Sequence, residues 1–273
     1  MNKIKFSVLM SVYKNDTPEN VKVAIDSILN QTLQPNQFVI MVDGKIPSKL
    51  EKMLDEVCEK NNIIELHKRD KNLGLGLTLN EGIKYCKYDY IARMDSDDIS
   101  LPNRFEKQIE FIRNNPSYDV IGGNIVEFDD LTNKDISNRN VPEKHDDIVK
   151  YSKKRNPVNH VSVVFLKSSV LSAGSYQDCM YFEDYYLWMR MIKSGFKFYN
   201  VQENLVRVRA GLNFSSRRGS LKYIKYIINF ENKIFGLGLI TIPTYIYNVF
   251  VRCIVSLMPN KLRYYLYQKK LRS

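Results

Sequence analysis

Three carboxylates stand together in the run Asp95-Ser96-Asp97-Asp98, directly after the apolar stretch Tyr90–Met94. Carboxylates at this spacing repel one another unless a cation joins them. Hard oxygen ligands suit Mg²⁺ or Mn²⁺, which usually share their coordination shell with substrate phosphates. We therefore expect Asp95 and Asp97 to hold a divalent cation together with a phosphate-bearing substrate. The alternative is a solvated acidic turn that caps a helix beginning near Pro102.

Two further charged residues, Arg93 and Asp43, lie at or near the carboxyl ends of predicted strands. Arg93 lies two residues before the acidic run and supplies a fixed cation suited to a diphosphate. Asp43 follows the apolar stretch Phe38–Val42 and precedes a glycine. Its carboxylate can accept hydrogen bonds from a base edge or a ribose hydroxyl, although an Asp-Gly pair alone more often marks a turn.

A second acidic pair, Glu183-Asp184, opens the aromatic run that contains Trp188. Such a carboxylate can act as a general base that takes a proton from an acceptor hydroxyl. Acidic residues in the first turn of a helix are also favoured by the helix dipole alone. The aromatic side chains, Trp188 among them, either form a platform on which a sugar stacks or belong to the core.

Two other segments are weaker candidates for binding. His160 adjoins a strand-like stretch, where a single histidine is more often structural than a ligand; we consider it for acceptor binding. The loop His67–Gly76 is basic, contains glycines and opens a helix, so it is able to hold an anion near the helix N-terminus. An ordinary loop remains the alternative.

The elements around these residues predict an α/β fold with a mostly parallel sheet. Short apolar runs alternate with amphipathic stretches from Phe6 to Met94, which is the pattern of repeated strand–helix–strand units. Phe6–Tyr13, Phe38–Val42, Ile63–Leu66 and Tyr90–Met94 are the predicted strands. Ligands of open α/β sheets bind beyond the carboxyl ends of such strands, where the acidic run and Asp43 fall.

The second half is less regular, and the chain changes character after Ala210. We expect an extended Val120–Phe128, a polar loop over Asp129–His145, a strand over Val161–Phe165 and a helix over Tyr181–Ser194. The predicted globular domain is residues 1–210. Residues 211–273 are rich in Lys, Arg, Tyr and Ile and are predicted to be a helical tail.

The charge is concentrated in that tail. From Asn204 to the C-terminus there are thirteen Lys or Arg and one acid, which leaves 28 basic and 29 acidic residues in the rest of the chain. A basic tail indicates nucleic-acid binding or adhesion to an anionic membrane. A nucleic-acid-binding protein is expected to have a basic body as well, so the near-neutral body argues against nucleic acid as a partner.

The four cysteines are scattered, which favours free thiols in a reducing compartment and a cytosolic location. The first residues, Met1–Lys5, contain no apolar stretch or cleavage site typical of a signal peptide.

The order of these landmarks resembles the inverting glycosyltransferases of family 2, which have the GT-A fold, a Rossmann-like sheet flanked by helices. The resemblance covers about Lys5 to Ala210. It rests on a strand ending in Ser-Val-Tyr-Lys, a strand followed by Asp-Gly, a basic loop with Asn-Leu-Gly, a strand running into Asp-Ser-Asp-Asp, and a helix opened by Glu-Asp.

This resemblance implies a role for each matching residue. Ser11, Tyr13 and Asp43 are expected to line the nucleotide, and Arg93 and Asp95 to lie near the ribose and diphosphate. Asp97 is expected to hold Mn²⁺ or Mg²⁺, with Asp98 beside it. Asp184 is expected to be the base, with Glu183 facing the acceptor. One departure is the loop Asn72–Thr78, which lacks the Ala-Arg-Asn that many relatives place after the glycine.

The residue pattern of the tail predicts that it contacts a membrane surface. Ile234–Val251 lacks charge but is too polar for a convincing membrane span, which needs about twenty mainly apolar residues. A helix lying in the interface, with tyrosines and basic residues at headgroup level, is the preferred interpretation. A basic helix docked on the body or used for dimerisation is the alternative.

The segment Arg217–Tyr226 resembles the region after the catalytic domain in bacterial amylovoran-type and O-antigen transferases. That resemblance implies a hexosyltransferase that moves galactose or glucose from a UDP-sugar to a polyprenyl-diphosphate-linked N-acetylhexosamine. A β linkage and a peripheral place on the cytoplasmic face of the bacterial inner membrane would follow, in the synthesis of O-antigen, capsule or exopolysaccharide.

Three other functions remain open at this stage. They are a transferase of the same fold that acts on a protein or free glycan, a non-catalytic partner in a membrane polysaccharide complex, and a nucleotidyltransferase. Against the last, the turn after the first predicted strand, Ser11–Lys14, is not glycine-rich.

Overall fold

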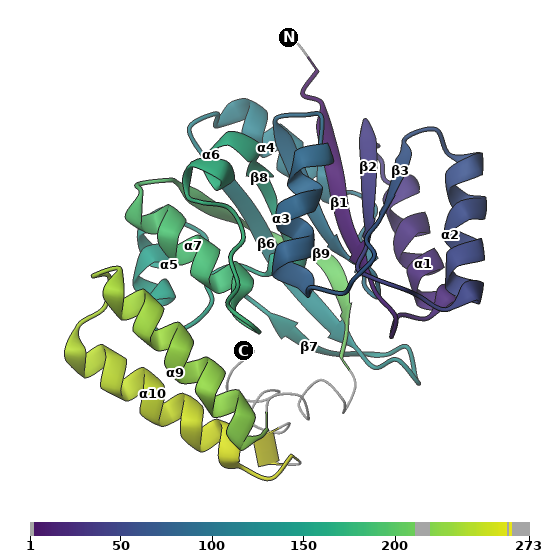
Figure 1. Ribbon diagram of the computed structural model, residues 1–273. Coiled ribbons are helices and arrows are strands. Elements are labelled where there is room, and N and C mark those ends of the chain that lie inside the picture. Colours follow the sequence, from purple (N-terminus) through teal and green to yellow (C-terminus); the bar gives the residue numbers. More distant parts are fainter. Residues whose placement is uncertain (1–2, 211–218, 261, 264–273) are drawn as a thin grey trace.

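The computed structural model describes residues 3–210, 219–260 and 262–263. One twisted sheet runs through the molecule, with helices on both faces and a helical hairpin, α9 (Leu221–Gly236) and α10 (Ile242–Leu257), at one end (Figure 1). The predicted α/β class with a mostly parallel sheet flanked by helices is confirmed. The predicted domain boundary near residue 211 lies outside the described residues, as does part of the segment Arg217–Tyr226.

The strands are β1 (Phe6–Val12), β2 (Gln37–Val42), β3 (Ile64–Lys68), β4 (Tyr90–Asp95), β5 (Ile99–Ser100), β6 (Val120–Phe128), β7 (Asp135–Arg139), β8 (Val164–Leu166) and β9 (Phe198–Arg209). The other helices are α1 (Pro18–Leu29), α2 (Ser48–Lys60), α3 (Leu75–Tyr85), α4 (Arg104–Asn114), α5 (His145–Ser152), α6 (Lys167–Ser172) and α7 (Glu183–Lys193), with a 3₁₀ turn η1 (His160–Ser162).

The sheet places the carboxyl ends of β1, β2 and β4 at one edge. Its strand order is β3-β2-β1-β4-β8-β6-β9-β5, and β7 pairs with β6 off this path. The first four strands are parallel, and the register sets Ser11 beside Asp95 on the two neighbouring strands β1 and β4. Residues far apart in sequence, from the turns after β1 and β4, therefore meet at one place.

Local sequence accounts for the start of α1. Thr17 has an extended backbone and its hydroxyl accepts a 3.3 Å hydrogen bond from the Asn20 N–H, which satisfies one of the free donors of the helix terminus. Pro18 occupies the first helical turn, where its missing N–H costs nothing. The buried residues of α1 are Val21, Ala24, Ile25 and Ile28, which follow helical spacing.

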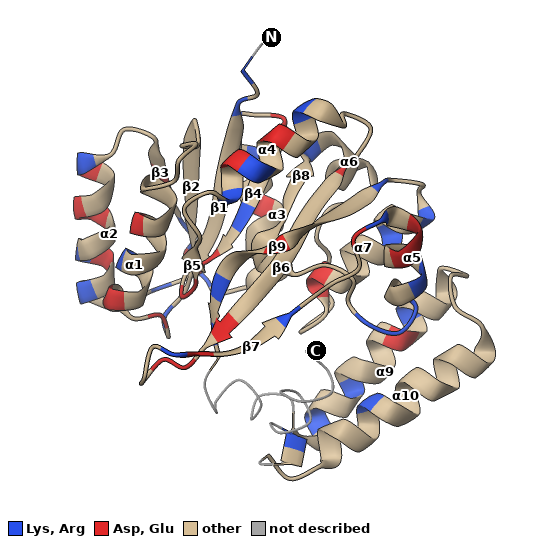
Figure 2. Ribbon diagram, turned by 180° about the vertical axis from the view of Figure 1, so that it is seen from behind, with Lys and Arg blue, Asp and Glu red and all other residues tan. Residues whose placement is uncertain are grey.

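Two apolar clusters lie on opposite faces of the sheet. α1, α2 and α4 pack on one face, where Phe6 contacts Phe105 edge-on at 5.0 Å between ring centroids. α3, α6 and α7 pack on the other, where Trp188 and Phe198 are fully enclosed (Figures 1 and 2). Burial of both faces explains why the strands read as continuous apolar runs.

The structure corrects two predicted elements. Val161–Phe165 is not one strand but the turn η1 followed by β8. The Ser162 hydroxyl donates to the Gly123 carbonyl at 3.1 Å, and such side-chain bonds compete with strand pairing. The predicted loop Asp129–His145 contains β7, which pairs antiparallel with β6. β7 is polar on both sides, so its own sequence carries no strand pattern.

A third apolar cluster joins the hairpin α9–α10 to α7. Phe230 of α9 is fully buried and stacks on Phe182 with 4.5 Å between ring centroids. The alternative of a helix docked on the body thus describes α9. α10 differs, because its buried residues are the polar Asn248 and Ser256. No described helix is long and apolar enough to cross a bilayer.

Candidate active site

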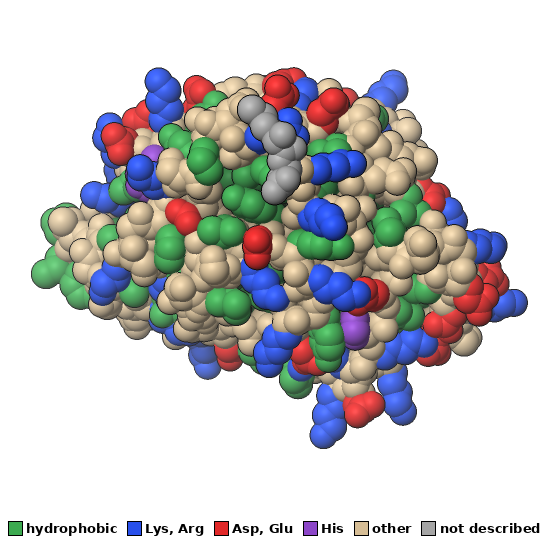
Figure 3. Space-filling view, turned by 90° about the horizontal axis from the view of Figure 1, so that it is seen from above, with side chains coloured by type: hydrophobic (Ala, Val, Ile, Leu, Met, Phe, Trp, Pro, Cys, Tyr) green, Lys and Arg blue, Asp and Glu red, His purple; other side chains and the backbone are tan. Residues whose placement is uncertain are grey.

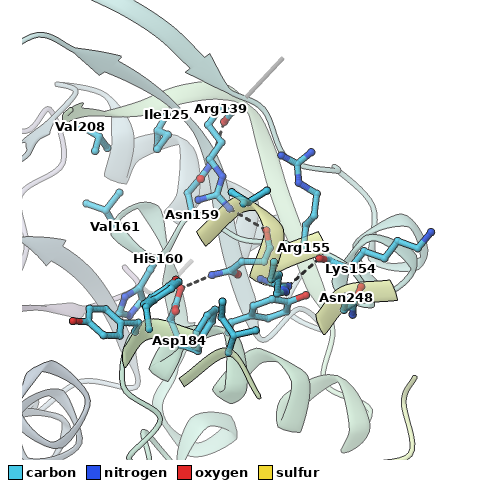
Figure 4. A pocket seen from close by; sticks show the side chains of 18 of the residues that line it. Ile125, Arg139, Lys154, Arg155, Asn159, His160, Val161, Asp184, Val208 and Asn248 are labelled. Carbon is cyan, nitrogen blue, oxygen red and sulfur yellow. Dashed lines mark hydrogen bonds between the residues drawn. The ribbon is translucent and has the colours of Figure 1, made fainter. Parts of the chain in front are cut away.

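A cavity of about 580 Å³ opens between the sheet, the segment 154–161, the start of α7 and the hairpin α9–α10 (Figure 4). Asp95, His160 and Asp184 line it, so three of the predicted site residues, which come from β4, η1 and α7, share one hollow. The remaining wall is partly apolar and partly basic. Concave sites with a few convergent polar groups are the usual form of a small-molecule site.

Asp95 is held from beneath by Arg93. The Arg93 guanidinium donates to both carboxylate oxygens of Asp95, and Arg93 is only 2% exposed while the Asp95 side chain is 36% exposed. The expected place of Arg93 near the ribose and diphosphate remains a prediction. Burial opposes the charge, but the Asp95 carboxylate keeps the pKa of Arg93 above its ordinary value.

Beneath this pair, Arg104 fixes the end of β4. Arg104 is fully buried and its guanidinium donates to the Arg93 carbonyl at 2.8 Å and to the Val163 carbonyl at 3.3 Å. The same guanidinium donates to Gln108 at 3.1 Å. Burial, with the nearby charge of Arg93, lowers the pKa of Arg104 to about 9.

Asp97 lies among other carboxylates at the end of β4. Asp97 is an exposed residue, yet partial desolvation by the surrounding protein, followed by the charges of Asp95 and Asp16, raises the pKa of Asp97 to about 6. Asp16 comes from the turn after β1 and accepts from the Ser96 hydroxyl at 2.8 Å and from the Tyr13 N–H at 2.9 Å. The negative charge gathered here is what a bound cation would neutralise.

Asp98 also lines the cavity. It is 3% exposed and accepts a 2.8 Å hydrogen bond from the backbone N–H of Arg209, at the end of β9. Burial and the neighbouring Asp97 raise the pKa of Asp98 well above its ordinary value. Asp98 thus joins the end of β9 to the acidic turn, and Asp95 and Asp97 are the carboxylates of the run with open faces.

Ser11 and Tyr13 lie at the same edge of the sheet, and both are partly exposed. Asp43 is different, because it is 3% exposed and its two oxygens accept 2.9 Å hydrogen bonds from the N–H groups of Leu73 and Gly74. Asp43 therefore fastens the glycine loop before α3. Its expected contact with the nucleotide remains a prediction.

Asp184 lies in the first turn of α7, beside the segment 154–156. Its carboxylate accepts a 2.6 Å hydrogen bond from the Asn156 side chain. Burial raises the pKa of Asp184, while the hydrogen bond from Asn156 and the charges of Arg93 and Arg139 oppose that rise. A carboxylate with an elevated pKa and one fixed hydrogen bond is suited to accept a proton.

Glu183 does not line the cavity but packs against the glycine loop. A side chain at Gly76 would meet the Glu183 Cγ at 2.8 Å, so glycine is needed at this close approach. Burial and the charge of Asp184 raise the pKa of Glu183 to about 7. The expectation that Glu183 faces the acceptor is not supported by this position.

His160 belongs to the cavity wall, where its Nε2 lies 2.7 Å from the Tyr176 hydroxyl. Burial and the charge of Arg93 keep the pKa of His160 well below its ordinary value, so the ring is neutral. Trp188, in contrast, is fully buried between His160 and Phe198. The prediction that Trp188 contacts the acceptor is wrong, because its ring is part of the core.

The carboxylates at this edge of the sheet fit a cation that also binds a substrate phosphate. No group of three or more metal-ligating side chains gathers within the described ranges. Mg²⁺ sites built from one or two carboxylates plus substrate phosphates need no such group, and the raised pKa of Asp97 reflects the charge that a cation would offset. Asp97, with Asp95 beside it, is the pair that fits.

Sequence reasoning missed four residues of this region: Asp16, Arg104, Arg139 and Asn156. Asp16 and Asn156 lie in loops, and their partners Ser96 and Asp184 are 80 and 28 residues away in the chain. Arg104 opens a helix and reads as a surface residue, yet it is fully buried. The one available signal was the cluster Lys153-Lys154-Arg155-Asn156 beside His160.

Comparison with known proteins identifies the family of this chain. The model of "Glycosyl transferase family 2" matches residues 7–171. The amylovoran biosynthesis glycosyltransferase AmsE of Erwinia amylovora is 36% identical over 97% of this chain and 98% of its own length. A UDP-Gal:alpha-D-GlcNAc-diphosphoundecaprenol beta-1,3-galactosyltransferase of Escherichia coli is 34% identical over 98% of this chain and 97% of its own length.

Two solved structures share the fold. Staphylococcus aureus TarS 1–349 with UDP-GlcNAc has a TM-score of 0.64 at 14% identity, over 84% of this chain and 66% of that one. The mannosyltransferase PcManGT of Pyrobaculum calidifontis, with GDP-Man and Mn²⁺, has a TM-score of 0.64 at 10% identity, over 96% and 72%. The fold is therefore of the GT-A type.

Proposed function

The chain belongs to glycosyl transferase family 2, whose members transfer sugars from nucleotide donors, and we propose that it is an inverting hexosyltransferase of bacterial polysaccharide synthesis. The proposed reaction moves galactose or glucose from a UDP-sugar to a polyprenyl-diphosphate-linked N-acetylhexosamine and forms a β linkage. The observation that carries the proposal is Asp184, held by Asn156 in the same cavity as Asp95.

The acceptor class is supported by the relatives. One of them is named for transfer from UDP-Gal to a GlcNAc-diphosphoundecaprenol and another for amylovoran synthesis, and both match nearly the whole of this chain. The match extends through the hairpin α9–α10, beyond the family model itself, which ends at residue 171. The hairpin closes one side of the cavity, so it belongs to the part of the site where acceptor is expected.

In the proposed reaction Asp184 takes the proton of the acceptor hydroxyl as that oxygen attacks the anomeric carbon. The bond to the nucleoside diphosphate breaks on the opposite side, which inverts the configuration. Positioned proton transfer of this kind contributes about 10²–10⁴-fold in rate. Asn156 orients the carboxylate by its 2.6 Å bond.

The donor is proposed to lie along the edge formed by β1 and β4. Ser11 and Tyr13 would line the nucleotide, and Asp95 would lie near the ribose and diphosphate, with Arg93 fixing the position of Asp95. Asp97, with Asp95, would hold Mn²⁺ or Mg²⁺, which neutralises the departing diphosphate when bound. A structural neighbour that contains Mn²⁺ supports a divalent cation here.

α10 supports a peripheral place on an anionic membrane. Its only charged residue is Arg252, whose side chain forms an ion pair with the buried Glu231 of α9. Its outward face is apolar, with Phe250 64% exposed and Ile246 59% exposed. An inward polar side and an outward apolar side is the arrangement of a helix lying in a membrane interface. The proposed location is the cytoplasmic face of the inner membrane.

Nucleic acid is not a proposed partner. Figure 3 shows basic side chains interspersed with acidic and apolar ones on the face from which the N-terminus leaves, without one continuous basic patch. The near-zero net charge of the rest of the chain, before Asn204, also argues against nucleic acid.

The competing functions are transfer to a protein or free glycan and a non-catalytic role in a polysaccharide complex.

The testing experiment measures release of nucleoside diphosphate from UDP-, GDP- and dTDP-sugars, with Mn²⁺ and with EDTA. A synthetic lipid-diphosphate-N-acetylglucosamine is the acceptor, and an octyl glycan and an acceptor protein are the comparisons. The proposal expects turnover of a UDP-hexose that needs the cation and the lipid-diphosphate acceptor, with a β linkage in the product by NMR. An α linkage, or turnover only with the comparison acceptors, would refute it.

A further inference from the structure

The cavity continues beyond Asp184 into a wall of basic residues that the proposed chemistry does not use. Arg139 of β7 and the neighbours Lys154 and Arg155 line it, and Figure 4 shows Arg139 and Arg155 on the wall that leads away from Asp184. The acidic lining residues are Asp95, Asp98, Glu127 and Asp184. The wall formed by Arg139, Lys154 and Arg155 is the basic part of this cavity.

The basic part is tied to the base through a single short segment. Asn156 bonds Asp184 at 2.6 Å through its side chain, and its own carbonyl accepts a 3.1 Å hydrogen bond from the Arg139 guanidinium. Lys154 and Arg155 directly precede Asn156, and consecutive Cα atoms are about 3.8 Å apart. The cations thus lie one or two residues from the group that orients the base.

α10 holds this segment from behind. Asn248 donates to the Lys153 carbonyl at 2.9 Å, and Arg252 donates to the Lys154 carbonyl at 3.0 Å. Both α10 residues also contact the fully buried Glu231 of α9, at 3.2 Å and 2.8 Å. Two backbone carbonyls are thereby occupied by the hairpin, which gives the segment a fixed position at the cavity wall.

The same helix lines the cavity with apolar side chains. Tyr247, Val251 and Val255 of α10 form part of its wall, and Tyr247 and Val251 remain 53% and 37% exposed. Lys154 lies over the Tyr247 ring, 5.1 Å from its centroid. The apolar outer surface of α10 is therefore continuous with the interior of the cavity, and the basic segment lies where the two meet.

We propose that Arg139, Lys154 and Arg155 bind the diphosphate of the lipid-linked acceptor, while its lipid chain follows Tyr247, Val251 and Val255 to the exposed face of α10. This assignment rests on the proposed function and extends it. Arginine pairs with phosphate oxygens through two parallel N–H groups, which suits a dianionic linker. The sugar attached to that diphosphate then extends toward Asp184, one short segment away.

The donor's own diphosphate is the competing ligand for these cations. The donor is proposed to bind beside Asp95 and Asp97, away from the basic wall. Substitution of the basic residues therefore distinguishes the two ligands. If the basic residues serve the acceptor, their loss weakens acceptor binding alone. If they serve the donor, their loss weakens UDP-hexose binding.

The experiment compares Lys154→Gln and Arg155→Gln with Lys60→Gln, an exposed lysine at the end of α2. Transfer from UDP-galactose and UDP-glucose is measured to farnesyl-diphosphate-N-acetylglucosamine and to octyl N-acetylglucosaminide, which lacks the diphosphate. Loss of one charged hydrogen bond corresponds to roughly a tenfold change. We expect the KM for the diphosphate acceptor to rise about tenfold in each cavity variant, with the KM for donor and for the octyl acceptor unchanged.

Equal effects on both acceptors, or a raised KM for the UDP-hexose, would overturn the assignment. Calorimetry with farnesyl diphosphate, farnesyl phosphate and farnesol in EDTA supplies a readout without turnover. Wild-type protein should prefer the diphosphate, and Arg155→Gln should remove that preference. If the diphosphate binds in this way but no lipid-linked acceptor is glycosylated, the proposed function fails and the subsite stands. Transfer that every cavity variant retains unchanged would refute the subsite and keep the function.

Discussion

The side chain of Asn156 donates a 2.6 Å hydrogen bond to the carboxylate of Asp184. This bond joins the segment before η1 to the first turn of α7, and it fixes one oxygen of the proposed base. Its other effect is on protonation. Burial raises the pKa of Asp184, and the hydrogen bond from Asn156 is the largest of the effects that oppose the rise.

Replacement of Asn156 by alanine is therefore expected to raise the pKa of Asp184 further. A base acts in its deprotonated form, so the acid limb of the kcat/KM profile should move to higher pH. Loss of a hydrogen bond to a charged group corresponds to about one pH unit. The measurement is the pH dependence of kcat/KM for the lipid-linked acceptor between pH 5 and 9.

Asn115→Ala provides the control for this series, because Asn115 makes one side-chain hydrogen bond, to the Phe111 carbonyl, far from the site. Its profile should match that of the wild type. An acid limb in Asn156→Ala that stays in place, or moves to lower pH, would show that Asn156 does not tune the base.

Glu183 provides a prediction about stability. Its pKa in the folded protein is raised to about 7, mainly by burial, against an ordinary value of 4.5. Between these values the folded protein binds more protons than the unfolded chain, so the free energy of unfolding should fall as pH rises, by up to roughly 1 kcal/mol per pH unit. Glu183→Gln should make this slope smaller, and the raised pKa values of Asp97, Asp98 and Asp184 account for the slope that remains.

Urea unfolding at pH 5, 6 and 7 measures the slope for the wild type and for Glu183→Gln. Glu59→Gln, at an exposed position of α2, is the control for the removal of one carboxylate. A slope as steep in Glu183→Gln as in the wild type would assign the whole pH dependence to other groups.

Arg104 is expected to contribute strongly to the stability of the folded protein. Its guanidinium bonds the carbonyls of Arg93 and Val163 in the protein interior. Arg104→Met would remove this donor from both carbonyls, although the Val163 carbonyl keeps its 2.9 Å hydrogen bond from the Arg93 N–H. We expect a loss of about 1–3 kcal/mol. Arg113→Met, on the exposed side of the same helix, should change the free energy of unfolding by less than about 0.5 kcal/mol. Equal effects of the two substitutions in urea unfolding would contradict this role.

The outward face of α10 leads to a prediction about membranes. Ile246→Glu and Phe250→Glu place a charge on residues that are 59% and 64% exposed, so the fold should be kept. Burial of one large apolar side chain is worth about 1.5–3 kcal/mol, and binding to vesicles of anionic lipid should fall more than tenfold. Val23→Glu, 42% exposed on α1, is the control in the same sedimentation assay. Unchanged binding would remove α10 as the membrane surface.

Local patterns in the sequence predicted much of the fold. The apolar runs that became β1, β2 and β4 are buried on both faces, and the Thr-Pro pair begins α1 where capping chemistry requires it. Because the carboxyl ends of parallel strands meet, the position of Asp95 at the site edge followed from its place after a strand. These inferences needed only neighbours in the chain.

Contacts between distant segments could not be predicted in the same way. β7 is a strand only because β6 pairs with it, and Arg104 is buried because Arg93 and Val163 present carbonyls to it. Asp43 had the type and place of a nucleotide ligand, yet its oxygens bond the loop at Leu73 and Gly74. Side-chain type predicted the chemistry of these residues, and three-dimensional contacts decided their partners.

The most direct test of the proposed reaction is the transfer rate of Asp184→Asn measured together with donor binding. Asn has nearly the same shape and can keep a contact with Asn156, but it cannot accept the acceptor's proton. With UDP-hexose binding by calorimetry within about twofold of the wild type, we expect transfer to the lipid-linked acceptor to fall at least a hundredfold. Transfer that stays within a few fold of the wild type would contradict Asp184 as the base and, with it, the proposed mechanism.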